Sequence, residues 1–185
     1  MKDELKYRIL KTLAETLDFT KTTQLITEVS KKQIQAFLFN LAETFKAQKL
    51  VNIYTDGAAR GNPGEAGIGF VIIAEDEKVI IKKGRYIGRA TNNEAEYHAI
   101  LSALKEAKTI GVREVKIFAD SELIVKQIKG EYRIKSEGLK PLYKEAMALL
   151  KEFDRYDIIH IVREKNKEAD RLANQAIDAM AGVVI

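Results

Sequence analysis

Residues 51–88, VNIYTDGAARGNPGEAGIGFVIIAEDEKVIIKKGRYIG, decide the fold class of this chain. The first six alternate between apolar and polar side chains, which predicts a β-strand that ends at Asp56. The segment GNPGEAG then predicts a turn-rich loop. The segments GIGFVIIA and KVIIKKGRYIG predict an antiparallel pair of strands, which is joined at residues 75–78.

After this segment, helical and strand patterns alternate along the chain. Gly111 ends the first predicted helix, and Ser121 caps the second. Helices are predicted at about 93–110, 121–130, 138–153 and 166–181, and strands at VKIFAD and DIIHIV. Three strands followed by alternating helices and strands predict an α/β fold, in which a sheet of mixed direction is covered by helices.

Residues 1–48 have a different pattern, in which apolar residues recur at helical spacing. They predict a small all-α segment of three helices, the middle one at 18–29, which resembles a helix-turn-helix in outline only. Ser30 and Gln33 predict a capping box for the third helix. Because the apolar period changes from about 3.6 to 2 near residue 48, we predict a helical segment at 1–48 and a second domain at 49–185.

The composition is that of an ordinary globular protein, with 46% hydrophobic and 31% charged residues. No apolar run approaches the ~20 residues that a transmembrane helix needs. The first ten residues are charged where a signal peptide would be apolar. We therefore expect a cytoplasmic protein without a membrane partner. The absence of cysteine excludes a disulfide framework and a thiolate metal site.

The net charge of +4 is mildly basic and unevenly distributed. Residues 1–50 contain nine Lys/Arg and six Asp/Glu, whereas the remaining residues contain 22 and 21. A nucleic-acid partner of the second domain would therefore need a local basic patch. Residues 1–48 could bind nucleic acid, or they could serve packing or dimerisation. The salt dependence of nucleic-acid affinity, with and without them, distinguishes these roles.

Four acidic residues occupy positions where ligands or apolar side chains are expected. Asp56 and Asp120 each end a predicted strand, and the carboxyl ends of strands collect ligands in α/β sheets. Glu96 lies on the apolar stripe of the helix at 93–110, and Asp170 repeats this pattern in the last helix. A buried carboxylate costs several kcal/mol unless a partner compensates its charge.

Each acid taken alone has a simpler explanation. An aspartate at a strand end is often a turn former, and an acid in the first turn of a helix interacts favourably with the helix dipole. Together, four such acids without matching buried lysines favour a divalent-cation site. Oxygen ligands without cysteine indicate Mg²⁺ or Mn²⁺ rather than zinc.

Four blocks of the sequence carry a family resemblance: IYTDGAARGNPGEAGIGFVI, TNNEAEYHAILSAL, FADSELIVKQI and NKEADRLANQA. In this order and spacing they resemble type 1 ribonuclease H. The resemblance implies a ribonuclease H-like fold, with a five-stranded mixed sheet flanked by helices. It also implies a metal-dependent endoribonuclease that hydrolyses the RNA strand of RNA–DNA hybrids and leaves 5′-phosphate and 3′-hydroxyl ends.

The resemblance further implies a catalytic and metal-binding set, to which each block contributes one acid: Asp56, Glu96, Asp120 and Asp170. Glu94 is the alternative in the second block, but the apolar stripe favours Glu96. The four acids would hold two Mg²⁺ ions, with Mn²⁺ as the alternative. Asp56 would bridge the ions, with Glu96 and Asp120 on one of them and Asp170 on the other.

Substrate contacts follow from the same resemblance. A phosphate of the DNA strand would be held by Asn62, Arg89 and Thr91. Asn92 and Asn93, with the backbone near Gly57, would contact the minor groove, where RNA displays its 2′-hydroxyls. The two asparagines could also cap a helix. A basic stretch could follow the substrate backbone or be a solvated helix end: Lys126, Lys129, Tyr132, Arg133 and Lys135.

Two features depart from the family. Many members carry a mobile histidine between the last strand and the last helix, where this chain has REKNKEAD. The resemblance is therefore to the subset without that histidine, and Arg163, Glu164 or the metals alone would serve product release. His160 is expected to be a structural strand residue, and no catalytic role is expected for His98. The usual basic protrusion is reduced, since the chain has no tryptophan.

Two other functions are alternatives. The chain could be a non-catalytic nucleic-acid-binding module on the same fold, although a binder has no reason to keep buried acids facing phosphates. It could also be a nuclease that acts on double-stranded RNA or on RNA–DNA junctions.

Overall fold

The computed structural model describes residues 3–16, 18–44 and 50–181. The chain divides into two compact units, Met1–Lys46 and Ala47–Ile185. The predicted boundary at residue 48 lies outside the described residues. Within the described ranges, no helix combines the length and the apolar character that crossing a bilayer requires.

The first unit contains three helices, α1 (Asp3–Thr16), α2 (Phe19–Leu25) and α3 (Lys31–Thr44). Its small core centres on Ile9, Ile26 and Ile34. The predicted capping box is confirmed: the Ser30 N–H donates to Gln33 Oε1 (2.8 Å), and the Gln33 N–H donates to Ser30 Oγ (3.3 Å). The middle helix is shorter than predicted, because the chain turns at residues 27–29 before Ser30 caps the next helix.

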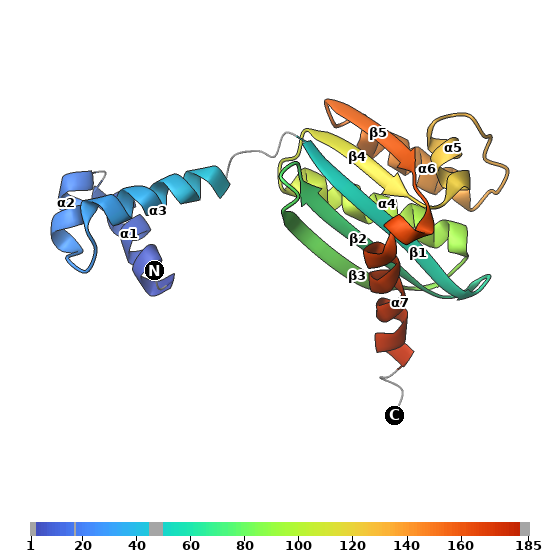
Figure 1. The fold of residues 1–185 in the computed structure, drawn as a ribbon, viewed down its shortest axis with the longest axis horizontal. Helices are drawn as coiled ribbons and strands as arrows, with labels where there is room; N and C mark the ends of the chain where they lie inside the picture. Colours follow the sequence, from blue (N-terminus) through green and yellow to red (C-terminus); the bar gives the residue numbers. More distant parts are fainter. Residues whose placement is uncertain (1–2, 17, 45–49, 182–185) are drawn as a thin grey trace. The chain divides into compact units, whose positions relative to one another are not determined.

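The second unit is built on a five-stranded sheet with the order β3-β2-β1-β4-β5 (Figure 1). Its strands are β1 (Leu50–Gly61), β2 (Gly64–Ala74), β3 (Val79–Ala90), β4 (Glu114–Ala119) and β5 (Arg155–His160). Strand β2 pairs antiparallel with β1 and β3, whereas β4 pairs parallel with β1 and β5. The predicted α/β fold with a mixed five-stranded sheet is confirmed.

Helices cover both faces of this sheet, and they are α4 (Asn92–Thr109), α5 (Glu122–Ile128), α6 (Leu139–Leu150) and α7 (Lys167–Ala181). Helix α4 packs on β1 and β2, and α6 packs against α4. Helix α7 packs on β1, β2 and β3, and Figure 1 shows it in front of the sheet with α4 behind. The main core lies between the sheet and α4 and includes Val51, Ile53, Ile100, Leu104 and Ile117.

The glycine-rich segment after Asp56 is not the loop that the sequence predicts. Strand β1 continues to Gly61 and β2 begins at Gly64, so only residues 62–63 lie between the strands. Asp56 is therefore inside β1 and not at its end. Strand β4 accompanies β1 only as far as the Thr55–Ala119 pair, and beyond it β1 pairs with β2 alone. Asp56 thus lies where the parallel ladder stops.

Glycines on β2 allow α7 to lie directly on the sheet. A Cβ atom at Gly69 would be 2.1 Å from the Ala169 carbonyl oxygen, and one at Gly67 would be 2.4 Å from the Ala173 carbonyl oxygen. Both distances are far shorter than van der Waals contact, so any side chain at these positions would push the helix away. These glycines therefore set the height of α7 above the sheet, and with it the reach of Asp170.

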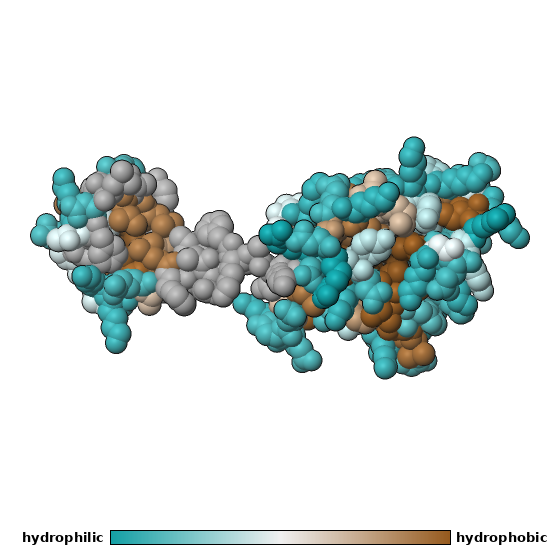
Figure 2. All heavy atoms as spheres, turned by 90° about the horizontal axis from the view of Figure 1, so that it is seen from above, coloured by the Kyte–Doolittle hydropathy of each residue, from teal (hydrophilic) through white to brown (hydrophobic). Residues whose placement is uncertain are grey.

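Hydrophilic side chains cover most of the face of the second unit shown in Figure 2, with smaller apolar areas between them. The large apolar side chains that are exposed in this unit come from separate elements: Val79, Ile110, Leu123, Tyr132, Tyr156, Val162 and Met180. Scattered exposure of this kind is ordinary for a folded surface.

Candidate active site

A cavity of about 480 Å³ lies beside the end of the parallel ladder. Four parts of the chain bring one acid each to its wall: Asp56 from β1, Glu96 from α4, Asp120 from directly after β4, and Asp170 from α7. This acid cavity is further lined by Gly57, Ala58, Ala59, Asn92, Ser121, His160, Ile161, Val162, Arg163 and Asn174.

Three of the four acids form a tight group. Asp56, Glu96 and Asp120 each offer a carboxylate oxygen, and these oxygens all lie within 4.8 Å of one another. Asp56 and Glu96 are only 5% and 4% exposed, whereas Asp120 is half-buried. Asp170 lies on the same wall but outside this group, and its Oδ1 accepts a hydrogen bond from Arg163 Nη2 (2.6 Å).

A capping box fixes the start of the helix that carries Glu96. The Glu94 N–H donates to Thr91 Oγ1 (3.3 Å), and the Thr91 N–H donates to Glu94 Oε2 (2.7 Å). The Thr91 N–H and hydroxyl groups both donate to the Glu94 carboxylate, and these two bonds lower the pKa of Glu94. Glu94 is thus engaged at the helix terminus, while Glu96 enters the cavity.

Gly57 lets α4 approach β1 more closely than any side chain would allow. A Cβ atom there would be 2.1 Å from the Glu96 backbone nitrogen and 2.2 Å from the Ala95 carbonyl carbon. The Gly57 backbone also hydrogen-bonds to the Glu96 carboxylate, which moderates the rise in its pKa. The glycine after Asp56 therefore brings the second acid within reach of the first.

Burial and mutual repulsion make the acid group unfavourable when all its members are charged. Burial, followed by the charges of Asp120 and Asp170, raises the pKa of Asp56 to about 8. Burial, followed by the charges of Asp56 and Asp120, also raises the pKa of Glu96 well above its ordinary value. Among the described residues that line the cavity, Arg163 alone carries a permanent positive charge. One guanidinium cannot neutralise four carboxylates.

The residues present fit a divalent cation. Glu96 Oε2 is buried and has no hydrogen-bond partner among the described residues, which is costly for a carboxylate oxygen. The acid group offers only oxygen ligands, the donor type that Mg²⁺ and Mn²⁺ prefer. A bound cation would both coordinate the unpaired Glu96 oxygen and neutralise the repulsion between the carboxylates.

The raised pKa of Asp56 predicts that the metal-free protein loses stability as pH rises. The carboxyl group has a pKa of about 8 in the folded protein against an ordinary value of 3.8, so the stability that it contributes is complete below the lower value. That stability is lost as pH rises through the higher value. Between about pH 6 and pH 9 we expect a loss of about 2 kcal/mol in EDTA.

Thermal unfolding in EDTA at several pH values measures this effect. Mg²⁺ is expected to reduce the slope, because a bound cation stabilises the charged acids. The Asp56→Asn variant is expected to lose much of the pH dependence. An identical slope in that variant would show that another group titrates.

Comparisons with known proteins identify the family. Residues 54–176 match a family model described as reverse transcriptase-like. Ribonuclease HI of Halobacterium salinarum is similar at 41% identity over 128 residues, which are 69% of this chain and 64% of that protein. The chain belongs to the ribonuclease H family.

Two further ribonuclease H relatives define the extent of the likeness. A bifunctional protein of Mycobacterium tuberculosis is 42% identical over 132 residues, which cover 71% of this chain and 36% of that protein. The match thus spans about two thirds of the Halobacterium salinarum protein and about a third of the Mycobacterium tuberculosis protein. LC11-RNase H1, which was isolated from compost by a metagenomic approach, has a sequence 43% identical to this chain. Its crystal structure was determined in complex with an RNA/DNA hybrid. The two structures superpose with a TM-score of 0.68, and the match covers 71% of this chain and 99% of the LC11-RNase H1 chain.

The residues that the sequence predicts to contact substrate do not all lie in one part of the structure. Gly57 and Asn92 line the acid cavity. Asn62 Oδ1 accepts a hydrogen bond from the Asn92 N–H (3.2 Å), which ties the β1–β2 turn to the start of α4. The Thr91 hydroxyl is engaged in the capping box, and Arg89 is exposed near the end of β3. The structure therefore brings Asn62, Thr91 and Asn92 together at one helix terminus.

A second hollow of about 510 Å³ collects another part of the expected contacts. It is lined by Asn93, Leu123, Gln127, Glu131, Tyr132, Arg133, Lys135, Ser136 and Leu139. Lys126 is not among them: its Nζ pairs with Glu122 (2.7 Å) and lies 5.0 Å from the centre of the Tyr132 ring. Of the basic stretch, Tyr132, Arg133 and Lys135 line the hollow, whereas Lys126 and Lys129 do not.

His160 is the last residue of β5, as its predicted place in a strand requires, and it is exposed and lines the acid cavity. That its role is structural stays a prediction. Its position follows from β5 ending beside β4, where His160 pairs with Ala119 directly before Asp120.

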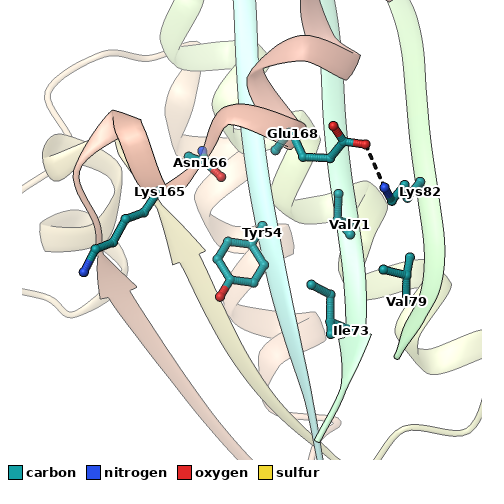
Figure 3. A pocket seen from close by; sticks show the side chains of 9 residues that line it. Tyr54, Val71, Ile73, Val79, Lys82, Lys165, Asn166 and Glu168 are labelled. Atoms are coloured by element: carbon teal, nitrogen blue, oxygen red, sulfur yellow. Dashed lines mark hydrogen bonds and ion pairs between the residues drawn. The ribbon is translucent and has the colours of Figure 1, made fainter. Parts of the chain in front are cut away.

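Asn166 is a site residue that the sequence did not reveal. It is 1% exposed, and its Nδ2 donates to the Thr55 carbonyl (2.8 Å), beside Asp56. Its own carbonyl accepts from the Asp170 N–H (3.1 Å). Figure 3 shows Asn166 before the start of α7 and next to β1. It lines a separate pocket of about 260 Å³, and none of the four acids is among the lining residues of that pocket. One buried side chain thus joins the backbones that carry two of the acids.

We expect Asn166→Ala to weaken both stability and metal binding. The variant leaves the buried Thr55 carbonyl without its donor, which costs about 1–3 kcal/mol. Loss of a group that orients metal ligands typically lowers metal affinity about 10- to 100-fold. Calorimetric Mg²⁺ titration and thermal unfolding measure the two effects. Gln175→Ala, an exposed change on α7, serves as the control. Wild-type Mg²⁺ affinity in Asn166→Ala would contradict the assignment.

Proposed function

We propose that this chain is a divalent-metal-dependent endoribonuclease that hydrolyses the RNA strand of RNA–DNA hybrids. The observation that carries the proposal is the group of three carboxylates within 4.8 Å, with Asp170 on the wall of the same cavity. Support also comes from the LC11-RNase H1 structure, in which a related chain is in complex with an RNA/DNA hybrid.

Four residues would hold the metal ions: Asp56, Glu96, Asp120 and Asp170. Two Mg²⁺ ions, or Mn²⁺ in their place, would supply an activated water and stabilise the leaving 3′-oxygen. Without a cation the same carboxylates repel a phosphodiester, so substrate binding and metal binding are coupled. Cleavage in this manner leaves 5′-phosphate and 3′-hydroxyl ends.

The preference for RNA would come from groups beside the acids. Asn92 and the backbone at Gly57 line the cavity, where they can hydrogen-bond to a 2′-hydroxyl. The hollow lined by Tyr132, Arg133 and Lys135 offers positive charge and an aromatic face to a nucleic-acid backbone. These groups would orient a hybrid without reading its sequence.

A cleavage assay tests the proposal. End-labelled RNA–DNA hybrid, duplex RNA, duplex DNA and an RNA–DNA junction are incubated with the full chain in Mg²⁺, in Mn²⁺ and in EDTA. We expect cleavage of the RNA strand of the hybrid that EDTA abolishes. Preferential cleavage of duplex RNA or of the junction would replace the proposed substrate. Tight hybrid binding without fragments in either metal would indicate a binding module instead.

A further inference from the structure

Arg163 makes the one strong contact between the acid cavity and a positive charge among the described residues. It belongs to a 3-10 turn (Arg163–Lys165) between β5 and α7. Its Nη2 donates to Asp170 Oδ1 over 2.6 Å. The Arg163 side chain is 74% exposed, whereas that of Asp170 is 27% exposed. The guanidinium thus reaches inward from the rim of the cavity to an acid on its wall.

This pairing occupies a carboxylate oxygen that could otherwise bind a metal ion. Asp170 stands apart from the three-acid group, and its Oδ1 is engaged by the guanidinium. The same positive charge extends to the other acids, since Arg163 opposes the rise in pKa of both Asp56 and Glu96. Arg163 is therefore a counter-ion for the whole cavity, with Asp170 as its direct partner.

We propose that Arg163 is an exchangeable counter-ion that holds Asp170 until a second metal ion takes its place, so that it sets the affinity of that ion. The inference rests on the proposed function of the same site. Exchange is feasible because an ion pair with one exposed partner is weak. A divalent ion carries twice the charge on a much smaller centre, so it outcompetes a guanidinium for the carboxylate.

Displacement would give Arg163 a second role. Its long side chain remains on the rim of the cavity, where the substrate phosphates arrive. A guanidinium suits phosphate oxygens, because it donates two parallel hydrogen bonds to them. Arg163 is therefore a positioning residue that alternates between a protein carboxylate and the substrate anion.

Arg171 provides a matched control on the helix that carries Asp170. Its Nε and Nη2 donate to the two oxygens of Glu168, each over 2.9 Å, and its Nη1 donates to Gln175. It does not line the acid cavity. Replacing Arg163 or Arg171 by glutamine removes the same charge from the same part of the chain, but only the first change frees Asp170.

Calorimetric titration of the full chain with Mn²⁺ and with Mg²⁺, without nucleic acid, tests the inference. In Arg163→Gln we expect the weaker binding step to become about three- to tenfold tighter, the effect of removing a competing ion pair. Arg171→Gln is expected to bind as the wild type does, and Arg163→Lys to lie between the wild type and Arg163→Gln. Thermal unfolding verifies that each variant is folded.

Unchanged or weaker metal binding in Arg163→Gln would overturn the inference. An equal tightening of metal binding in Arg171→Gln would also overturn it, because the change in net charge alone would then explain the effect. These outcomes are independent of the cleavage assay. If the wild type cleaves no nucleic acid while Arg163→Gln still tightens metal binding, the proposed function fails and the exchange at Asp170 stands.

Discussion

The Asp56→Asn variant is expected to lose Mg²⁺-dependent cleavage of RNA–DNA hybrid almost completely. Asp56 interacts with all three other acids. Its carboxylate lies within 4.8 Å of those of Glu96 and Asp120, and the charge of Asp170 raises its pKa. An amide keeps the size of the side chain but removes the negative charge that would bind metal. A metal ion contributes several kcal/mol to such a reaction, so kcat should fall at least about a thousandfold.

The same variant is expected to be more stable than the wild type in EDTA. Above its ordinary pKa of 3.8, the folded protein must either keep this carboxyl group protonated or bury its charge beside Asp120 and Asp170, and an amide avoids both costs. Asp157→Asn, an exposed change on β5, serves as the control for both measurements. Full hybrid cleavage by Asp56→Asn would end the assignment of the acid cavity as the active site.

Substituting Gly57 by alanine should impair both folding and cleavage. The new Cβ would meet the backbone of α4 at 2.1 Å, and a backbone cannot move aside as a flexible side chain can. The helix must shift by about an ångström, at a cost of about 1–3 kcal/mol for overpacking. Because Glu96 moves with the helix, we expect cleavage to fall about a hundredfold.

Gly138→Ala is the matched control for this change. Gly138 has a helical φ of −64°, and its new Cβ would approach only two side-chain oxygens, Glu94 Oε1 at 3.0 Å and Ser136 Oγ at 3.9 Å. Denaturant unfolding and the hybrid assay measure the two losses. Wild-type stability together with wild-type cleavage in Gly57→Ala would mean that β1 and α4 do not approach as closely as described.

The sequence predicts the fold and the acids whose signals are local. Glu96 is predictable because a carboxylate on an apolar stripe is visible in the spacing of neighbouring residues. The mixed sheet follows from the order of the strand and helix patterns. These features depend on residues that are close in the chain, so one sequence suffices to predict them.

The glycine-rich segment shows where such reasoning fails. Glycine usually indicates a turn, so the sequence predicts that the strand ends at Asp56, before Gly57, and that residues 61–67 form a loop. In the structure Gly57 and Gly67 lie within strands. They are glycines because α4 and α7 come too close there for a side chain. A glycine that makes room for a distant helix has the same local signature as one that allows a turn.

The places of Asn166 and His160 in the site depend on contacts between distant segments. Asn166 reaches Thr55, which is 111 residues earlier in the chain. His160 reaches the cavity only because β5 ends beside β4. No periodicity or spacing records such contacts, so a single sequence could not predict them.

The close seating of α7 on Gly67 and Gly69 has a consequence for how this molecule can vary. Because the backbone of α7 packs directly on the backbone of β2, the position of the fourth acid depends on two small residues of the strand beneath it. The outer surface of α7, which includes Arg171, Gln175 and Asp178, is exposed and can accept new side chains during evolution. A labelling group or an affinity handle could be attached there by design without disturbing the chemistry underneath.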